Sequence, residues 1–249
     1  MKKILGILMA TMLIFSTNAE DKKTSFDLTT STDSFFGLNF LASGSVNVME
    51  NLDITMYGLW WTSEGLTNGA GEGTPWTEFG AGVTYKLTEG LSATALIGVL
   101  SGNLQSNTTA AVATVGESIV PNLTVNYTDD KLQAQLYVGF YKTLYTGANE
   151  RGSVSDYFHY WVNIGYKVMP NFVVGTHYEV LDQSAAYATA GSDTKTSTPG
   201  LAYQWVGPYI EMVLPKNNAS LRFAGGWELI ENTRNAADHF YKMSFVLSF

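Results

Sequence analysis

Apolar and polar residues alternate along most of the chain with a period of two. In the clearest stretch, apolar or small side chains take every second position from Phe36 to Val48, with small and polar residues between them. After residues 49–51 the pattern resumes over residues 52–60 with its parity kept. Successive side chains of a strand point to opposite faces, so this pattern predicts two strands joined by a tight turn. One face of the hairpin is apolar and the other is small and polar.

The same hairpin pattern recurs along the chain. Tight turns are predicted at residues 49–51, 88–90, 129–130, 169–171 and 216–218. Long polar connections alternate with them, at residues 63–75, 103–118, 144–156, 184–199 and 231–238. Counting back from Phe249 gives about eleven strands, and residues 24–32 supply a twelfth. Short turns at one end and long loops at the other predict an all-β transmembrane antiparallel barrel of about 12 strands, with short periplasmic turns and long extracellular loops.

Aromatic residues collect at both ends of the apolar face. Beside the short turns stand Tyr85, Tyr127, Tyr166 and Phe172, and toward the long connections stand Trp60, Tyr160, Tyr178, Trp227 and Tyr241. Aromatic girdles at two membrane interfaces are typical of outer-membrane barrels. A soluble β-sandwich is the alternative, but the opposite face of the strands is too polar to form a second core.

The first residues have the pattern of a secretory signal. A basic start, Met1–Lys3, is followed by an apolar run to Phe15 and by small residues up to Ala19. This order predicts a signal peptide over residues 1–19 and one barrel domain over residues 20–249. Removing the two signal lysines takes the net charge from -8 to -10, and an acidic exported chain is a poor nucleic-acid binder. The chain has no cysteine, which excludes disulfides and thiolate metal sites.

The last residues, HFYKMSFVLSF, alternate polar and bulky apolar side chains up to the terminal phenylalanine. Tyr241, Phe245 and Phe249 resemble the C-terminal signal of chains that the Gram-negative barrel-assembly machinery inserts. The stretches SFFGLNF, WTEFGAGV, VPNLTVN, YWVNIGYK and YQWVGPY also resemble a family of outer-membrane proteins of unknown function, porin-like in fold. The resemblance implies the outer membrane of a Gram-negative bacterium, with its lipids, its assembly machinery and periplasmic chaperones as partners.

The alternation also assigns the inward face. The candidates for lining a pore are Trp61, Trp76, Tyr137, Tyr141, Tyr157, His159, Trp161, His177, Glu179, Glu211, Arg222, Glu228 and Lys242. Across the 216–218 turn, Glu211 falls opposite or diagonal to Arg222, and Glu228 is expected to reach Lys242. Such pairs either brace the wall of the lumen or act as selectivity elements. The inward aromatic rings either form a track for sugars or nucleosides or fill a narrow lumen.

A catalytic site is not predicted. His159, His177 and Glu179 face the lumen on neighbouring strands, but their heights differ and the pattern sets no serine beside them. Neither His-x-Ser nor Asp-x-Asp, motifs sought in barrel lipases, deacylases and proteases, occurs in the chain. No cofactor or metal site is expected, and an outer-membrane hydrolase remains a minor alternative.

Residues 207–208, Gly-Pro, interrupt a predicted strand. Strict alternation points Pro208 outward in mid-strand and turns Tyr203 and Trp205 into the lumen. A β-bulge at Gly207-Pro208 would leave the proline nitrogen unpaired and place Trp205 in the outer girdle, and this is the arrangement expected. Since barrels of 8 strands are filled and those of 16–18 strands enclose a wide channel, we expect a narrow passive pore for small polar solutes. The alternative is a closed structural barrel.

Overall fold

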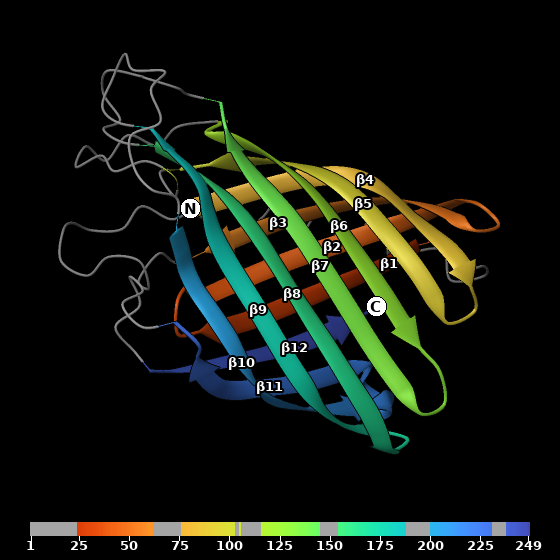
Figure 1. Ribbon diagram of the computed structural model, residues 1–249. Coiled ribbons are helices and arrows are strands. Elements are labelled where there is room, and N and C mark those ends of the chain that lie inside the picture. The colour runs from red at the N-terminus through yellow and green to blue at the C-terminus, as the bar shows by residue number, and fades with distance from the viewer. Residues whose placement is uncertain are drawn as a thin grey trace, which may run out of the picture.

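A computed structural model describes residues 24–61, 76–102, 105, 116–144, 154–187, 200–230 and 238–249. Over these residues, twelve strands form one closed antiparallel barrel (Figure 1). The expected fold class is confirmed, and so is the short first strand. The predicted signal peptide, residues 1–19, lies outside the described residues. Among the described residues, no helix is long and apolar enough to cross a membrane.

Each strand pairs with the next one in sequence, and β1 pairs with β12 to close the ring. The strands are β1 (Thr24–Asp33), β2 (Gly37–Met49), β3 (Leu52–Trp61), β4 (Trp76–Thr88), β5 (Leu91–Ser101), β6 (Ser118–Thr128), β7 (Leu132–Thr143), β8 (Val154–Met169), β9 (Phe172–Tyr187), β10 (Gly200–Leu214), β11 (Ala219–Glu228) and β12 (His239–Ser248). A single 3-10 turn, η1 (Pro215–Asn217), joins β10 to β11 in the described part of the chain.

The seam between β1 and β12 holds the end of the chain. Asp27 lies opposite Ser248 in the ladder. Beyond it, the Phe249 N–H donates to the Phe26 carbonyl over 2.8 Å, and the two rings lie 6.0 Å apart. The alternating C-terminal sequence is therefore the last strand, which completes the hydrogen bonding of the barrel.

The connections divide the barrel into two ends. At one, here called the short-turn end, the strands are joined by residues 50–51, 89–90, 129–131, 170–171 and 215–218. At the other, the long-connection end, residues 62–75, 102–117, 144–153, 188–199 and 229–238 separate consecutive strands. The β1–β2 turn, residues 34–36, is an exception, since it is short and lies at the long-connection end.

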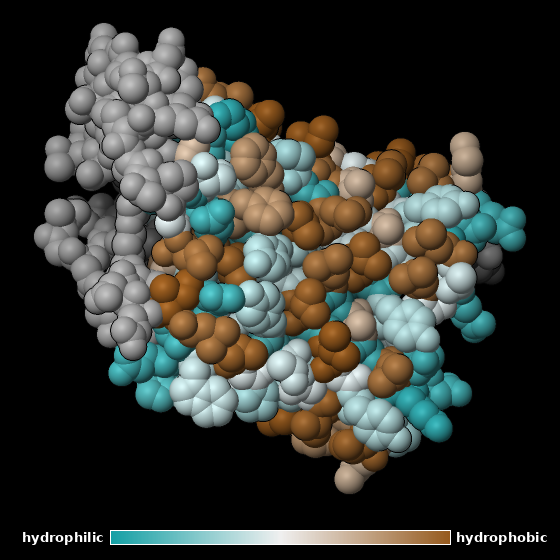
Figure 2. Space-filling view, in the orientation of Figure 1, coloured by the Kyte–Doolittle hydropathy of each residue, from teal (hydrophilic) through white to brown (hydrophobic). Residues whose placement is uncertain are grey.

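The outer wall carries an apolar belt. Large apolar side chains at mid-strand are largely uncovered, for example Phe79 at 61% and Ile97 at 64% of their full exposure. Brown, apolar residues are spread over the visible wall among paler ones, and teal residues gather at the short-turn end (Figure 2). The rings predicted at the two girdles lie on this outer surface; Trp60, Tyr85, Tyr166, Trp227 and Tyr241 are all exposed. An uncovered belt of this size is stable only against lipid, so the architecture is that of an outer-membrane β-barrel.

The expected bulge at Gly207-Pro208 is wrong. Gly207 and Pro208 pair with His177 and Thr176 of β9 without a shift, and the register toward β11 is the same before and after them. The irregularity in β10 lies between Leu201 and Tyr203. Pro208 is exposed on the outer wall. The barrel tolerates it because the pairing with β11 lapses locally while the β9 ladder stays intact.

Trp205 is consequently inside the barrel and fully buried. The outer-girdle position was expected from its height, on the premise that a tryptophan there needs lipid. That premise fails because the lumen at this height is filled with other rings, which supply the apolar surroundings.

Candidate functional site

The inward face of the barrel carries the predicted set of side chains. Register with neighbouring strands puts on that face Trp61, Trp76, Tyr137, Tyr141, Tyr157, His159, Trp161, His177, Glu179, Glu211, Arg222, Glu228 and Lys242. Their role as pore-lining residues stays a prediction. Their surroundings differ sharply between the two halves of the lumen.

Two packed clusters, together called the aromatic layer, lie mainly in the half near the long-connection end, and the first of them extends along β9 to Val173 near the short turn of residues 170–171. One contains Phe35, Val173, Leu181, Ala202, Tyr203, Trp205, Tyr209, Ala224 and Phe240, and the other contains Trp61, Trp76, Leu100, Val120 and Tyr141. Trp205 stacks between Tyr203, with centroids 3.9 Å apart, and Phe240, at 4.9 Å. Tyr137 and Trp161 stack at 5.5 Å. The predicted rings therefore pack mainly against one another.

The β1–β2 turn joins these clusters across the lumen, which the sequence pattern did not indicate. Phe36 was assigned to the outer face with Leu38 and Phe40, but the strand begins only at Gly37. The Phe35 ring lies 4.8 Å from Tyr203, and the Phe36 ring lies 6.4 Å from both Trp61 and Tyr203. Phe36 therefore bridges β3 and β10, which belong to opposite walls of the barrel.

Local geometry holds this turn in place. The Asp33 carboxylate accepts the backbone N–H groups of Phe35 at 2.9 Å and Phe36 at 2.5 Å, as in an Asx-turn. Gly37 then takes a positive φ of 66°, which a side chain disfavours. The signal in the sequence is the Asp33 to Gly37 spacing, DSFFG, which suits a tight turn more than a strand. Residues 33–37 are called the aromatic turn below.

Glu179 lies at the centre of a buried polar network beneath the aromatic turn. One carboxylate oxygen accepts from His159 Nε2 at 2.8 Å and from Tyr203 at 2.8 Å. The other accepts from His177 Nε2 at 2.9 Å and from Lys242 Nζ at 2.6 Å. Four donors fill the acceptor positions of a carboxylate that has no exposed surface.

The sequence placed His159 and His177 at different heights, and this is correct, since His177 lies opposite Asn163. The carboxylate between them spans that difference. The network also connects β8, β9, β10 and β12. The alternation pattern of a single hairpin could not predict contacts among four strands.

Of the two predicted ion pairs, one forms. Glu211 lies opposite Arg222, and its carboxylate is 2.7 Å from Arg222 Nε and 2.5 Å from Nη2. The Glu228–Lys242 pair is wrong, because Lys242 reaches Glu179 instead. Glu228 accepts from the Gln204 N–H at 2.7 Å and from the Trp205 indole at 3.0 Å. Because Trp205 faces inward, its indole N–H reaches Glu228. The outward position predicted for Trp205 did not allow this contact.

A second polar contact crosses the lumen near β3. The Tyr57 hydroxyl donates to Glu78 and accepts from Asn122 of β6 at 3.2 Å. Space for the ring comes from two inward glycines, since a Cβ on Gly80 or Gly98 would lie 2.2 or 2.3 Å from Tyr57 atoms. Tyr57 was not singled out from the sequence, although paired inward glycines facing an aromatic position are a usable signal.

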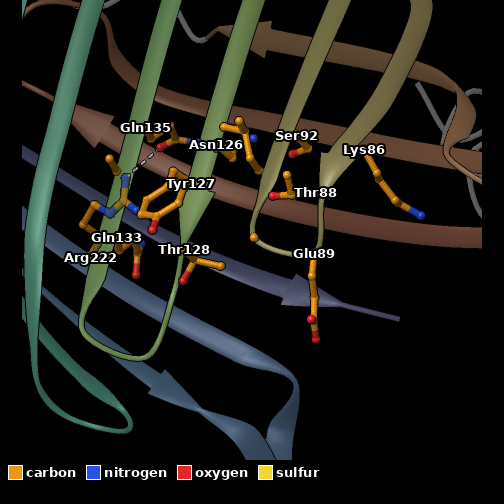
Figure 3. Close-up of a pocket in the computed structure, with 13 residues that line it drawn as sticks. Lys86, Thr88, Glu89, Ser92, Asn126, Tyr127, Thr128, Gln133, Gln135 and Arg222 are labelled. Carbon is orange, nitrogen blue, oxygen red and sulfur yellow. Dashed lines mark hydrogen bonds between the residues drawn. The ribbon is translucent and has the colours of Figure 1, made fainter.

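The short-turn half of the lumen is open by comparison. A cavity of about 430 Å³, called the short-turn cavity, is lined mainly by polar side chains of β4, β5, β6, β7 and β11 (Figure 3). They are Lys86, Thr88, Glu89, Ser92, Asn126, Thr128, Gln133, Gln135 and Arg222, with Tyr127 at the edge. Arg222 reaches across from β11 to β7, where Nη1 donates to Gln135 Oε1 at 3.1 Å.

Further hydroxyl groups lie on the inward face of β1 to β5 in this half. Thr84 is hydrogen-bonded to Thr55 at 2.7 Å and to Thr94 at 2.9 Å, and Ser25 to Ser45 at 2.8 Å. Among the described residues, no group of three or more His, Asp or Glu side chains is arranged to hold a metal ion. The hydroxyls of this half can thus offer hydrogen bonds to a solute.

Comparison with known proteins adds a family and a fold. The model of a family of unknown function, DUF6733, matches residues 1–249. No curated protein matches the chain. Among solved structures, the COG4313 outer membrane channel from Pseudomonas putida F1 is 11% identical, with a TM-score of 0.61 over 94% of this chain and 100% of that one.

Two other barrels are similar to a lesser degree. A KdgM porin in complex with disordered oligogalacturonate is 15% identical, with a TM-score of 0.50 over 90% of this chain and 99% of that one. A NanC porin is 7% identical, with a TM-score of 0.50 over 89% and 98%. At these identities the likeness establishes a common fold.

Proposed function

The chain belongs to this family, DUF6733, whose function is unknown, and we propose from its geometry that it is a narrow outer-membrane channel for small polar solutes. The observation that carries the proposal is the short-turn cavity, a space of about 430 Å³ with many polar residues in its lining, in a barrel with an apolar outer belt. A barrel that served only as a scaffold would gain stability by filling this space. The protein would lie in the outer membrane of a Gram-negative bacterium.

The number of strands supports a narrow passage. Barrels of 8 strands are filled by side chains, and those of 16–18 strands leave an aqueous channel. This barrel has twelve strands in its described part, and half of its lumen is filled. The similar structures include one termed a channel and two termed porins, which supports the same proposal.

The aromatic turn is the candidate barrier to passage, because Phe35 and Phe36 pack across the lumen between Trp61 and Tyr203. Phe35 and Phe36 enter the lumen from a short turn at the long-connection end, and only the turn and its packing hold them there. Solute would pass when these rings move aside. The rest of the aromatic layer belongs to the strands themselves and is fixed by the barrel wall.

The test is ion conductance in planar lipid bilayers. We expect small, discrete steps for the wild type and clearly larger steps for the Phe35→Ala/Phe36→Ala double variant. Phe40→Ala is the matched control, since Phe40 is on the same hairpin but faces outward at 41% exposure. Absence of steps in both the wild type and the double variant, with correctly folded protein, would contradict the channel.

A closed structural barrel is the second candidate, and the packing of the aromatic layer favours it. Trp205, Tyr203 and Leu100 have no exposed surface. If the lumen never opens, the double variant conducts no better than Phe40→Ala. The same recordings therefore separate the two functions.

We propose in addition that the assembly machinery of the outer membrane recognises β12. Its alternate residues Tyr241 and Phe245 face outward, and Phe249 follows the strand at 72% exposure. Deleting Phe249 should lower the membrane yield more than deleting a connection residue such as Ala188, which lies outside the described residues. Equal yields of folded protein would exclude this role.

A further inference from the structure

We infer that the short-turn cavity accepts neutral polyhydroxylated solutes, and that Glu211 determines this specificity by masking Arg222. This inference rests on the proposed channel function and names the class of solute. It follows from how each charge in the cavity is already bound, and from the hydrogen-bonding groups that remain.

Arg222 is the guanidinium that a charged solute would meet. It projects from β11 into the cavity toward β7 (Figure 3). Its Nε and Nη2 lie 2.7 and 2.5 Å from one oxygen of Glu211, and Nη1 donates to Gln135 at 3.1 Å. The two-pronged edge that binds carboxylates in many proteins is therefore occupied from within the chain.

Glu211 is well placed to mask that charge. It is 7% exposed, and the oxygen that binds Arg222 also accepts from Gln133 Nε2 at 3.0 Å. A carboxylate with three donor contacts from two side chains is fixed in position. An acidic solute would have to displace it and leave its charge unpaired, at a high cost in free energy.

The second base in the cavity also has an acidic partner, although its side chain is 50% exposed. Lys86 Nζ lies 3.2 Å from Asp53, which also accepts from Asn47 at 2.7 Å. The remaining lining charge is Glu89, an acid on the exposed β4–β5 turn. Thus no lining charge in the described part of the cavity favours an anion.

Several of the other lining residues carry neutral hydrogen-bonding groups. Asn126 has an amide, and Ser92 and Thr88 have hydroxyls, all facing the cavity. Next to the lining, on β3, β4 and β5, the Thr55–Thr84–Thr94 chain offers further hydroxyls that can donate or accept. Sugar hydroxyls have the same dual character, so a neutral saccharide is the complementary class.

Equilibrium dialysis with purified, detergent-solubilised protein tests the inference without requiring conduction. The probes are maltotriose, which is neutral, and trigalacturonate, an acidic saccharide of similar size. The variant is Glu211→Gln, which keeps the shape of the side chain and frees the charge of Arg222. The matched control is Glu50→Gln, which removes the same charge from an exposed turn at the same end, outside the cavity.

We expect the wild type and Glu50→Gln to bind maltotriose in preference to trigalacturonate. Glu211→Gln should bind trigalacturonate at least about fivefold more tightly than the wild type does. This is the smallest gain expected when a carboxylate meets one uncompensated positive charge in a hydrated site. A heat-dependent shift on SDS gels confirms that each variant is folded. Equal gain in Glu50→Gln, or a wild type that prefers trigalacturonate, would overturn the inference.

Failure of the channel proposal looks different. If the barrel is closed but the inference holds, maltotriose still binds by dialysis while the bilayer recordings show no steps. If the barrel conducts but binds neither saccharide, the specificity is wrong and the channel stands.

Discussion

The two halves of the lumen have the same wall but opposite contents. Near the long connections, rings stack at 3.9 to 4.9 Å and a carboxylate with no exposed surface has four donors. Near the short turns, hydroxyls, amides and two neutralised bases surround a cavity. The first half is built like the core of a soluble protein, and the second like a wet binding surface. Stability should therefore depend on the first half and solute specificity on the second.

This difference also explains the aromatic turn. A short connection at an end where the others are long brings Phe35 and Phe36 into the packed half, against Tyr203 and Trp61. The two rings add apolar contacts to the packed half. Unlike the other rings there, they come from a turn and not from a strand. A packed lumen in which only the turn carrying Phe35 and Phe36 would have to move is compatible with a narrow channel.

Truncation of one side chain in each half gives the strongest test of the comparison. Trp205→Ala should lower the free energy of unfolding by about 3 to 5 kcal/mol, because it empties the centre of a stack. Thr94→Ala, on the hydroxyl wall, should cost about 1 kcal/mol or less. Urea unfolding in lipid vesicles measures both, and similar losses would show that the two halves are packed alike.

Removal of one buried acid in each half should give the next largest contrast. Glu179→Gln keeps the shape but leaves Lys242 without its counter-charge, and should cost about 2 to 3 kcal/mol. Asp53→Asn leaves Lys86, whose side chain is 50% exposed and hydrated, and should cost about 1 kcal/mol or less. The same unfolding curves provide the comparison, and a costlier Asp53→Asn would reverse our assignment of the halves.

The barrel could be predicted well from the sequence, because the alternation of apolar and polar residues identifies each strand from its own residues. Twelve strands, the tight turns and the inward set all follow from that rule, and so does the Glu211–Arg222 pair, which spans one hairpin. Contacts across the lumen could not be predicted in this way. The Glu179 network joins β8, β9, β10 and β12, and its members are set by barrel shape more than by local spacing.

The two errors have different causes. Trp205 was expected to face lipid because its height matches the aromatic girdle, whereas Phe36 was expected to face outward because the alternation was extended past Gly37, where the strand begins. In the structure both rings find apolar surroundings inside. Alternation gave the correct face for Trp205, and the bulge that was added to correct it was unnecessary.

Gly37→Val tests whether the aromatic turn depends on its backbone. A β-branched residue at φ 66° should cost about 1 to 3 kcal/mol. The turn would relieve this strain by withdrawing from Asp33, so conductance should rise as in the double phenylalanine variant. Ser34→Val, on the same turn, is the control. Unchanged conductance in Gly37→Val would mean that packing alone holds the rings.

The smallest effect is expected at the short-turn end, in the β6–β7 turn. Asp129 accepts from the Tyr127 hydroxyl and from the Lys131 and Leu132 N–H groups, each at 2.7 Å. These bonds, that of Tyr127 first, lower the pKa of Asp129 from 3.8 to about 2. The ionised form is thus favoured in the folded state. Its contribution is fully present above pH 3.8 and is lost as the pH falls toward 2.

Asp129→Asn should therefore lower the thermal midpoint slightly at neutral pH, by an amount that shrinks below pH 4 and vanishes near pH 2. Asp130→Asn removes the same charge from the same turn and separates this effect from net charge. The midpoint is read from the temperature at which the folded band disappears on SDS gels. A difference between wild type and Asp129→Asn that persists at pH 2 would show that the turn depends on the shape of Asp129 and not on its charge. A difference as large as that of Trp205→Ala would mean that the short-turn end, and not the aromatic layer, limits the stability of the barrel.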